Sequence, residues 1–286
     1  MQYISLNDGN KMPQLGFGVF QINDLSLAEQ AVSQAIEVGY RLFDTAAAYG
    51  NEAAVGKAIA KSGLPREDFF VTSKLWVDHA SYEKAREGID DSLNKLDMDY
   101  LDLYLLHQPY GDVVGAWRAL EEAQAAGKIR SIGVSNFYAD QIKNLELMSR
   151  VQPAVNQIEV SPWYQQACEA AFMQGEGIAV EAWAPFAEGK DGIFTNEQIA
   201  QIGQKYGKSN GQVILRWLLQ RGIIAIPKSV HYERMAENFA VFDFELTDAE
   251  MSLLKTLDKN ESQFFSHRDP AAIESIFGAS LRALRN

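Results

Sequence analysis

Four side chains that could move a proton to or from a substrate follow short apolar runs: Asp44, Tyr49, Lys74 and His107. A hydride that arrives at a carbonyl carbon leaves negative charge on the oxygen, which then needs a proton and an electrostatic clamp. Tyr49 could supply the proton, although the free pKa of tyrosine is about 10. A buried Lys74 ammonium beside the phenol would lower that pKa. Asp44 would hold Lys74 charged and in place, and His107 could orient the carbonyl. The set therefore suits carbonyl reduction.

Each of these residues also has an ordinary structural interpretation. Asp44 could cap a turn, and Tyr49 could pack on the helix that follows it. Lys74 could simply leave a sheet for solvent, and His107 could be a satisfied core histidine. The chemical interpretation depends on the four residues lying at neighbouring strand ends on one face of the fold.

Apolar runs with strand character alternate with helical patterns along the chain. The predicted strands are residues 14–18, 40–44, 69–74, 101–107, 129–134, 154–157, 178–183 and 223–226. The predicted helices are residues 27–38, 51–61, 81–96, 113–126, 138–148, 165–174, 196–206, 209–220, one from about 232, and 247–257. Eight such strands predict an α/β protein, a (β/α)8 TIM barrel over residues 14–240, in which all strand C-terminal ends meet at one face.

A doubly wound open sheet is the alternative fold. It is disfavoured because no G-x-G-x-x-G follows the first strand, where the chain reads Leu15-Gly16-Phe17-Gly18-Val19-Phe20. Residues 2–13 predict an N-terminal hairpin cap around Asn7-Asp8-Gly9-Asn10. Thr247 and Glu250 form a capping box at the start of a C-terminal helix, which a tail follows. No linker, low-complexity segment or charge block interrupts residues 1–286, so we expect a single domain.

Composition limits the function classes. The chain has 286 residues, is 47% hydrophobic and carries a formal net charge of −12, which argues against nucleic acid and anionic membrane surfaces. We find no signal peptide and no apolar run of membrane-spanning length. The single cysteine, Cys168, permits no internal disulfide, so a cytoplasmic location is expected. His79 and His231 lack a cluster of further ligands, and no metal is assigned.

The chain resembles the aldo-keto reductase family over essentially its full length. The matching stretches are Leu15-Gly16-Phe17-Gly18, Phe43-Asp44-Thr45-Ala46-x-x-Tyr49-Gly50-Asn51-Glu52, Val71-Thr72-Ser73-Lys74-Leu75-Trp76, Leu103-Tyr104-Leu105-Leu106-His107, Gly127-Lys128-Ile129-Arg130-Ser131-Ile132-Gly133-Val134-Ser135-Asn136-Phe137 and Ile226-Pro227-Lys228-Ser229-Val230. The resemblance implies a (β/α)8 barrel that uses NADPH, with Tyr49, Lys74, Asp44 and His107 as its catalytic tetrad. Bacterial members similar to 2,5-diketogluconate reductase form the nearest subgroup.

A cofactor site is expected at the ends of the later strands. By resemblance, Ser135, Asn136 and Gln157 hold the nicotinamide carboxamide, and Trp183, where the family usually has Tyr, stacks on the ring. Lys228, Ser229, Val230 and Arg234 follow the last strand, and the resemblance places Lys228, Ser229 and Arg234 at the adenosine 2′-phosphate. It places Glu237 and Asn238 at the adenine, while His231 replaces a small residue of the family. Turn and cap chemistry, core packing and a solvated helix start are the alternatives at these positions.

Aromatic side chains beyond the strand ends suggest a substrate cleft. Phe20, Trp76 and Tyr110, together with His107, are the expected substrate contacts, and Trp163 and Phe186 are further candidates. Each aromatic could equally be core. Gln108, where many family members carry Trp, should make one wall more polar. In the family the tail after residue 258 closes over the substrate.

Three functions are open from the sequence. The first is NADPH-dependent reduction of aldehydes and ketones to alcohols, with a small carbonyl compound as substrate. The second is a nicotinamide-binding sensor or regulatory subunit with little turnover. The third is a Schiff-base aldolase with Lys74 as nucleophile, which a paired ammonium disfavours. No interface signal stands out, and a monomer is expected.

Overall fold

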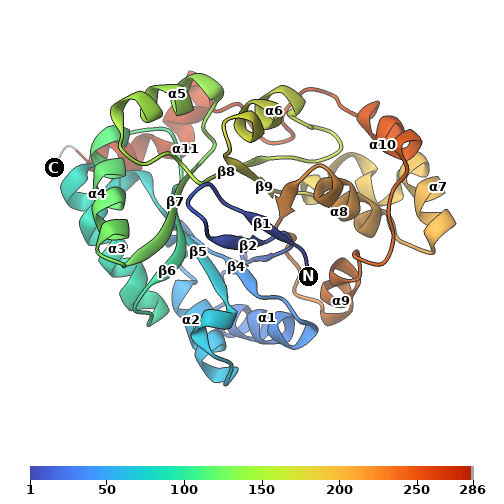
Figure 1. Cartoon of the computed structure of the whole chain (residues 1–286), viewed down its shortest axis with the longest axis horizontal. Helices are drawn as coiled ribbons and strands as arrows, with labels where there is room; N and C mark the ends of the chain where they lie inside the picture. Colours follow the sequence, from blue (N-terminus) through green and yellow to red (C-terminus); the bar gives the residue numbers. More distant parts are fainter. Residues whose placement is uncertain (285–286) are drawn as a thin grey trace.

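The computed structural model describes residues 1–284 as a barrel of eight parallel strands covered by helices (Figure 1). The strands are β3 (Phe17–Gly18), β4 (Leu42–Asp44), β5 (Phe70–Leu75), β6 (Leu101–Leu106), β7 (Ile129–Ser135), β8 (Val155–Glu159), β9 (Ala179–Trp183) and β10 (Ile223–Ala225). Each strand pairs in parallel with the next one in sequence. The two ends of the sheet meet where Leu15 bridges Ala225, which closes the barrel. The predicted (β/α)8 barrel is therefore confirmed.

Helices lie outside the strands, in sequence alternation with them. They are α1 (Leu25–Val38), α2 (Glu52–Lys61), α3 (Tyr82–Leu96), α4 (Val113–Ala125), α5 (Ala139–Met148), α6 (Ala167–Gly175), α7 (Glu197–Tyr206), α8 (Asn210–Gln220), α9 (Tyr232–Phe239), α10 (Asp248–Lys255) and α11 (Pro270–Ala283). Short 3-10 helices are η1 (Ala47–Tyr49), η2 (Arg66–Asp68), η3 (Val77–His79) and η4 (Ala187–Thr195). The predicted capping box at α10 is present, since the Thr247 side chain accepts from the Glu250 amide and the Glu250 side chain accepts from the Thr247 amide.

Side chains of each strand alternate between the barrel interior and the helices, because successive strand residues point to opposite faces. One apolar cluster fills the interior and includes Leu42, Leu105 and Val155. A second, larger cluster lies between strands and helices and includes Phe43 and Tyr104. Both faces of the strands are thus buried, which explains why the strands are nearly continuous apolar runs in the sequence.

The N-terminal hairpin closes one end of the barrel. It consists of β1 (Tyr3–Ser5) and β2 (Lys11–Pro13), and in Figure 1 it crosses in front of the strands. Leu6 and Met12 are 5% and 0% exposed and join the interior cluster. Burial of such side chains stabilises a fold by about 1.5–3 kcal/mol each. The predicted cap is confirmed, and it leaves the C-terminal ends of the strands as the open face.

The C-terminal segment differs from the prediction, which treated residues beyond 258 as a tail. Residues 270–283 form the helix α11, which the Asp269 side chain caps and Pro270 starts. The Trp76 indole donates to the Ser280 hydroxyl at 3.1 Å, so α11 packs beside the end of β5. The tail therefore contributes an ordered wall at the open face.

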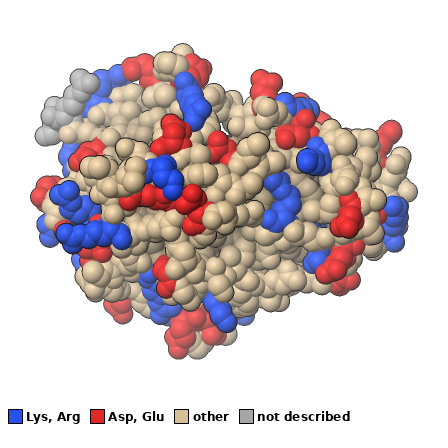
Figure 2. Space-filling model, turned by 45° about the horizontal axis from the view of Figure 1, so that its top comes forward, with Lys and Arg blue, Asp and Glu red and all other residues tan. Residues whose placement is uncertain are grey.

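The surface carries charges of both signs. On the face drawn in Figure 2, acidic and basic side chains are scattered among uncharged ones, and the described residues form no extended basic area there. None of the helices in the described part of the chain has the length and apolar character needed to cross a membrane.

Candidate active site

The inward face of several strands changes from apolar to polar toward the open end. Two residues beyond the inward-facing Leu42 of β4 comes Asp44, and two residues beyond Leu105 of β6 comes His107. Lys74 takes the equivalent place near the end of β5. Because side chains two apart in a strand share a face, these groups line the inside of the open end. The structure therefore places Asp44, Lys74 and His107 at neighbouring strand ends on one face of the barrel, as the sequence predicted.

Lys74 links the predicted acid and its carboxylate. Its Nζ donates to Asp44 Oδ1 at 2.6 Å, to the Thr45 carbonyl at 2.9 Å and to the Tyr49 hydroxyl at 3.3 Å. Lys74 is fully buried, and Asp44 is 2% exposed. An ammonium has three donors, and this arrangement uses all of them. The Lys74 ammonium is consequently held in one position, and the Tyr49 hydroxyl is the most distant of its three partners.

Charge and burial act in opposite directions on this pair. Burial raises the pKa of Asp44, while the neighbouring Lys74 ammonium lowers it. Burial lowers the pKa of Lys74, but Asp44, Tyr49 and Glu181 raise it above the ordinary value for lysine. Lys74 therefore stays protonated at neutral pH. A protonated amine cannot attack a carbonyl, so the geometry argues against the aldolase alternative.

Tyr49 differs from the sequence-based expectation in its net pKa. Lys74 lowers it, as expected, but burial raises it more, and the balance lies above the usual value. Tyr49 is accordingly a phenol at neutral pH and can act only as a donor toward a much stronger base. The oxygen of a carbonyl whose carbon has just received a hydride is an alkoxide, and an alkoxide is such a base.

His107 stands beside Tyr49 as a neutral ring. The two ring centroids are 5.7 Å apart, and the planes meet at 75°. Burial, Lys74 and His267 all hold the pKa of His107 well below its usual range. Its Nδ1 is buried and forms no hydrogen bond within residues 1–284. A neutral imidazole has one N–H to offer, which matches the predicted role of orienting a carbonyl oxygen.

Glu181 is a site residue that the sequence-based prediction missed. It lies inward on β9, is 0% exposed, and its Oε2 accepts from Gln157 Nε2 at 2.7 Å. The same Gln157 nitrogen donates to Asp44 Oδ2 at 2.9 Å. The signal was present, since Glu181 is an acidic residue inside the otherwise apolar run 178–183. What the sequence does not reveal is that β8 and Gln157 connect it to Asp44.

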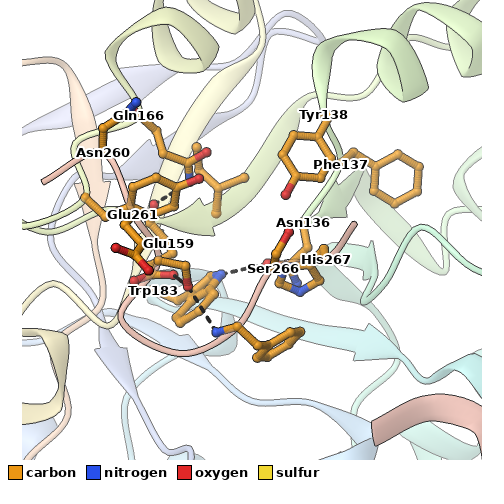
Figure 3. A pocket seen from close by; sticks show the side chains of 14 residues that line it. Asn136, Phe137, Tyr138, Glu159, Gln166, Trp183, Asn260, Glu261, Ser266 and His267 are labelled. Atoms are coloured by element: carbon orange, nitrogen blue, oxygen red, sulfur yellow. Dashed lines mark hydrogen bonds between the residues drawn. The ribbon is translucent and has the colours of Figure 1, made fainter. Parts of the chain in front are cut away.

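The predicted carboxamide-binding residues form one hydrogen-bonded group. Ser135 Oγ donates to the Gln157 carbonyl at 2.9 Å, and Asn136 Nδ2 donates to the His107 carbonyl at 3.1 Å. Asn136 directly follows β7 and has a left-handed backbone, φ 66°. The Trp183 indole donates to Asn136 Oδ1 at 2.8 Å (Figure 3). Asn136 Oδ1 and Ser135 Oγ each already accept one hydrogen bond, so the second lone pair of each oxygen, together with Gln157 Oε1, is what remains for an incoming amide.

The predicted phosphate-binding residues follow β10. Lys228 and Arg234 are exposed, and neither forms an ion pair with a carboxylate in the described part of the chain. Ser229 is buried, and its Oγ accepts from the His231 amide at 3.0 Å. Unpaired cations of this kind suit an anionic ligand.

The remaining three predicted cofactor residues line the same segment. Val230 is half-buried, Asn238 is 8% exposed, and Glu237 accepts a hydrogen bond from the Ser209 hydroxyl of the neighbouring helix start. The structure thus brings Val230, Glu237 and Asn238 to the side of α9 near α8 without showing a ligand contact.

Comparison with known proteins decides the family. A sequence profile of the aldo/keto reductase family matches residues 14–259. The chain belongs to this family. Glyoxal reductase of Bacillus subtilis (strain 168) is 43% identical over 259 residues, which are 90% of this chain and 93% of the relative. Methylglyoxal reductase DkgA of Escherichia coli (strain K12) is 44% identical over 261 residues, 90% of this chain and 94% of the relative.

Solved structures agree. The aldo-keto reductase of Bombyx mori in complex with NADP superposes with a TM-score of 0.89 at 38% identity and covers 96% of each chain. An aldo-keto reductase from a Medee basin deep-sea metagenome library gives a TM-score of 0.91 at 38% identity, over 93% of this chain and 98% of the other. The protein is therefore an oxidoreductase of the aldo-keto reductase family.

A cavity of about 220 Å³ opens beside Asn136, one of the residues predicted to bind the nicotinamide carboxamide (Figure 3). Asn136, Trp183 and His267 are among its lining residues. His267 comes from the segment before α11, and burial lowers its pKa to about 4. Its Nε2 is buried and has no hydrogen-bond partner among residues 1–284. His267 is a second site residue that the prediction did not single out.

Two of the predicted substrate aromatics pack against the tetrad, and a third contacts the C-terminal segment. Phe20 is 51% exposed, and its ring centroid is 4.9 Å from that of Tyr49. Trp76 lies 5.0 Å from His107, centroid to centroid. Tyr110 donates its hydroxyl to the His267 carbonyl at 2.6 Å and so reaches the cavity through the C-terminal segment.

The two further candidate aromatics, Trp163 and Phe186, contact loop residues instead of the tetrad. Trp163 is buried and donates to the Lys190 carbonyl in η4, and Phe186 packs on Phe194 with centroids 5.3 Å apart. Gln108 is 7% exposed, and its buried Oε1 has no partner within the described chain; the polar wall expected there stays a prediction.

Proposed function

We propose that this aldo-keto reductase reduces small aldehydes and ketones to alcohols with NADPH, and that Tyr49, Lys74, Asp44 and His107 carry the proton chemistry. The Lys74 ammonium, which contacts both Asp44 and the Tyr49 hydroxyl, is the observation on which the proposal rests. All four residues come from one chain. A monomeric, single-domain protein is therefore a sufficient working unit, and a cytoplasmic location fits the single free Cys168.

The residues divide the reaction between them. When bound, NADPH would supply the hydride. Tyr49 donates its proton to the carbonyl oxygen as negative charge develops there. Lys74 then stabilises the phenolate that Tyr49 leaves behind, and Asp44 keeps the ammonium fixed. His107 donates a hydrogen bond to the same oxygen and so orients the carbonyl.

The donor and acceptor groups fit NADPH at both ends. The acceptor oxygens of Ser135, Asn136 and Gln157 would receive the carboxamide N–H groups, and Trp183 would cover the nicotinamide ring. The unpaired cations Lys228 and Arg234, with Ser229, would hold the 2′-phosphate, because guanidinium and ammonium groups favour phosphate oxygens. Val230, Glu237 and Asn238 would border the adenine end.

Short α-oxoaldehydes are the first substrates to test. Two relatives carry the names glyoxal reductase and methylglyoxal reductase. The cavity of about 220 Å³ is lined by Asn136 and His267 among others but not by Tyr49 or His107, so it would take only the part of a substrate that lies beyond the reacting carbonyl. A compound with two adjacent carbonyls offers one oxygen to Tyr49 and His107 and a second oxygen to another donor, for which His267 is available.

The deciding experiment follows NADPH oxidation by absorbance across simple aldehydes, α-dicarbonyls and keto-sugars, with NADH in parallel. Oxidation that depends on the carbonyl compound and is faster with NADPH supports the proposal. Tight NADPH binding without oxidation by any compound would instead favour the nicotinamide-binding sensor.

Replacing Arg234 by alanine is expected to raise the Kd for NADPH about 10- to 100-fold, because a charge-assisted contact to phosphate is lost. The Kd for NADH, which lacks that phosphate, should change much less. Fluorescence titration of both nucleotides measures the difference. Arg118→Ala on α4, an exposed arginine outside the site, is the matched control. Equal losses for NADPH and NADH would remove Arg234 from the phosphate site.

Replacing His267 by phenylalanine is expected to lower kcat/KM for methylglyoxal about tenfold, since the second carbonyl oxygen loses its donor. A simple aldehyde of similar size should be affected much less. His267→Gln keeps an N–H donor and should restore most of the activity. Steady-state kinetics on both substrates tests this, and a uniform loss for the two compounds would contradict the assignment.

A further inference from the structure

Two buried carboxyl groups share one amide nitrogen at the base of the site. Gln157 Nε2 donates to Asp44 Oδ2 at 2.9 Å and to Glu181 Oε2 at 2.7 Å. Gln157 and Glu181 are register partners on β8 and β9, so the pairing is fixed by the sheet. The other oxygen of Glu181, Oε1, is buried and has no hydrogen-bond partner within residues 1–284.

The charges inside the barrel do not balance if both carboxyls are ionised. Glu181 and Lys74 are 0% exposed and Asp44 is 2% exposed. Asp44 contacts the Lys74 ammonium directly at 2.6 Å, whereas Glu181 is linked to it only through Gln157 and then Asp44. A second ionised carboxylate would be a buried charge without a partner of its own, which is strongly unfavourable. A proton on Glu181 removes that charge.

We propose that Glu181 is a positioning residue that carries a proton at neutral pH. Through its hydrogen bond with Gln157, the protonated Glu181 keeps Asp44 directed at Lys74. In this arrangement the Tyr49 phenol remains able to donate its proton. The inference deepens the proposed function and rests on it for its kinetic consequence.

The ionisable groups around Glu181 determine which other pKa values change when Glu181 loses its proton. Asp44 on β4, Lys74 on β5 and Tyr49 in η1 are the ionisable groups that interact with it. Its lateral neighbours in the sheet are Gln157 and Ile224, which do not ionise. Burial and then Asp44 raise the pKa of Glu181 to about 8. Above that pH the new negative charge raises the pKa of Tyr49 and makes it a poorer acid.

The pH profile of carbonyl reduction is the first test. In the wild type, kcat/KM should begin to fall as pH rises through about 8, and in Glu181→Gln the fall should begin at least about one pH unit higher. Both proteins hold a neutral side chain at this place near neutral pH, so the comparison rests on where each profile begins to fall. Identical profiles for wild type and Glu181→Gln would overturn the inference. If the glutamine variant does not fold, Glu181→Leu serves instead, with the same expectation.

Glu250→Gln is the matched control. Glu250 is 4% exposed but lies in α10, outside the barrel interior, and glutamine preserves the capping box there. Its profile should coincide with that of the wild type.

Infrared difference spectroscopy separates this inference from the proposed function. The wild type minus Glu181→Gln spectrum near neutral pH should contain the carbonyl stretch of a protonated carboxylic acid, and that band should vanish at alkaline pH. This readout needs no turnover. Absence of the band would overturn the inference even in an active enzyme, whereas a band in a protein that reduces no carbonyl would support it and overturn the proposed function alone.

Discussion

Replacing Tyr49 by phenylalanine is expected to lower kcat for carbonyl reduction by about 10²- to 10⁴-fold, the usual contribution of a positioned general acid. Only the hydroxyl is removed. The ring contacts with Phe20 and His107, at centroid distances of 4.9 and 5.7 Å, are retained. The affinity for NADPH should therefore stay close to that of the wild type, which fluorescence titration measures beside the kinetics.

Tyr82→Phe provides the control for Tyr49→Phe. The Tyr82 hydroxyl donates to Glu122 at the surface, and its loss should leave kcat unchanged. Turnover of Tyr49→Phe within about tenfold of the wild type would assign the proton to another donor. A parallel loss of NADPH affinity would show that the substitution had disturbed more than the acid.

Replacing Lys74 by methionine is expected to lower the free energy of unfolding by about 3–5 kcal/mol, because it leaves a buried carboxylate without its ammonium. Methionine has a similar length, so packing changes little. Reduction should fall as well, since the phenolate of Tyr49 would no longer face a positive charge. Urea unfolding, followed by circular dichroism, measures the stability.

The destabilisation in Lys74→Met should grow as pH rises. Burial already raises the pKa of Asp44, and removal of Lys74 takes away the largest influence that lowers it. The folded variant then holds a proton that the unfolded chain releases above the ordinary carboxyl pKa of about 4, so stability is lost as pH rises toward the folded-state pKa.

Lys61→Met, which removes an exposed lysine paired with Glu29, is the control and should cost less than about 1 kcal/mol. A similar small loss in Lys74→Met, independent of pH, would contradict the role assigned to the buried pair.

The barrel and the positions of the tetrad were predictable from the sequence because both follow local rules. Short, mostly apolar runs such as 101–106, alternating with helical patterns, favour strands buried on both faces, and parallel barrel strands end together. Asp44, Lys74 and His107 each stand at such an end, so their proximity follows from topology alone.

Features that depend on packing between distant segments were not predictable in the same way. The net pKa of Tyr49 is set by how completely the barrel buries it, which no spacing reveals. Glu181 was visible as an acidic residue in an apolar strand, but its partner lies on another strand. The helix α11 did have a local signal, since Asp269 and Pro270 form a favourable helix start. Its contact with Trp76, however, depends on the tertiary fold.

The family profile ends at residue 259, whereas His267 and α11 come after it. The tetrad and the predicted cofactor residues all lie before that boundary, and the wall formed by His267 and by α11 against Trp76 lies beyond it. The residues proposed to transfer the proton and one wall of the neighbouring cavity thus come from successive parts of the sequence. We expect that exchanging residues 260–284 would reshape this wall while leaving the barrel and the proposed proton-transferring residues unchanged.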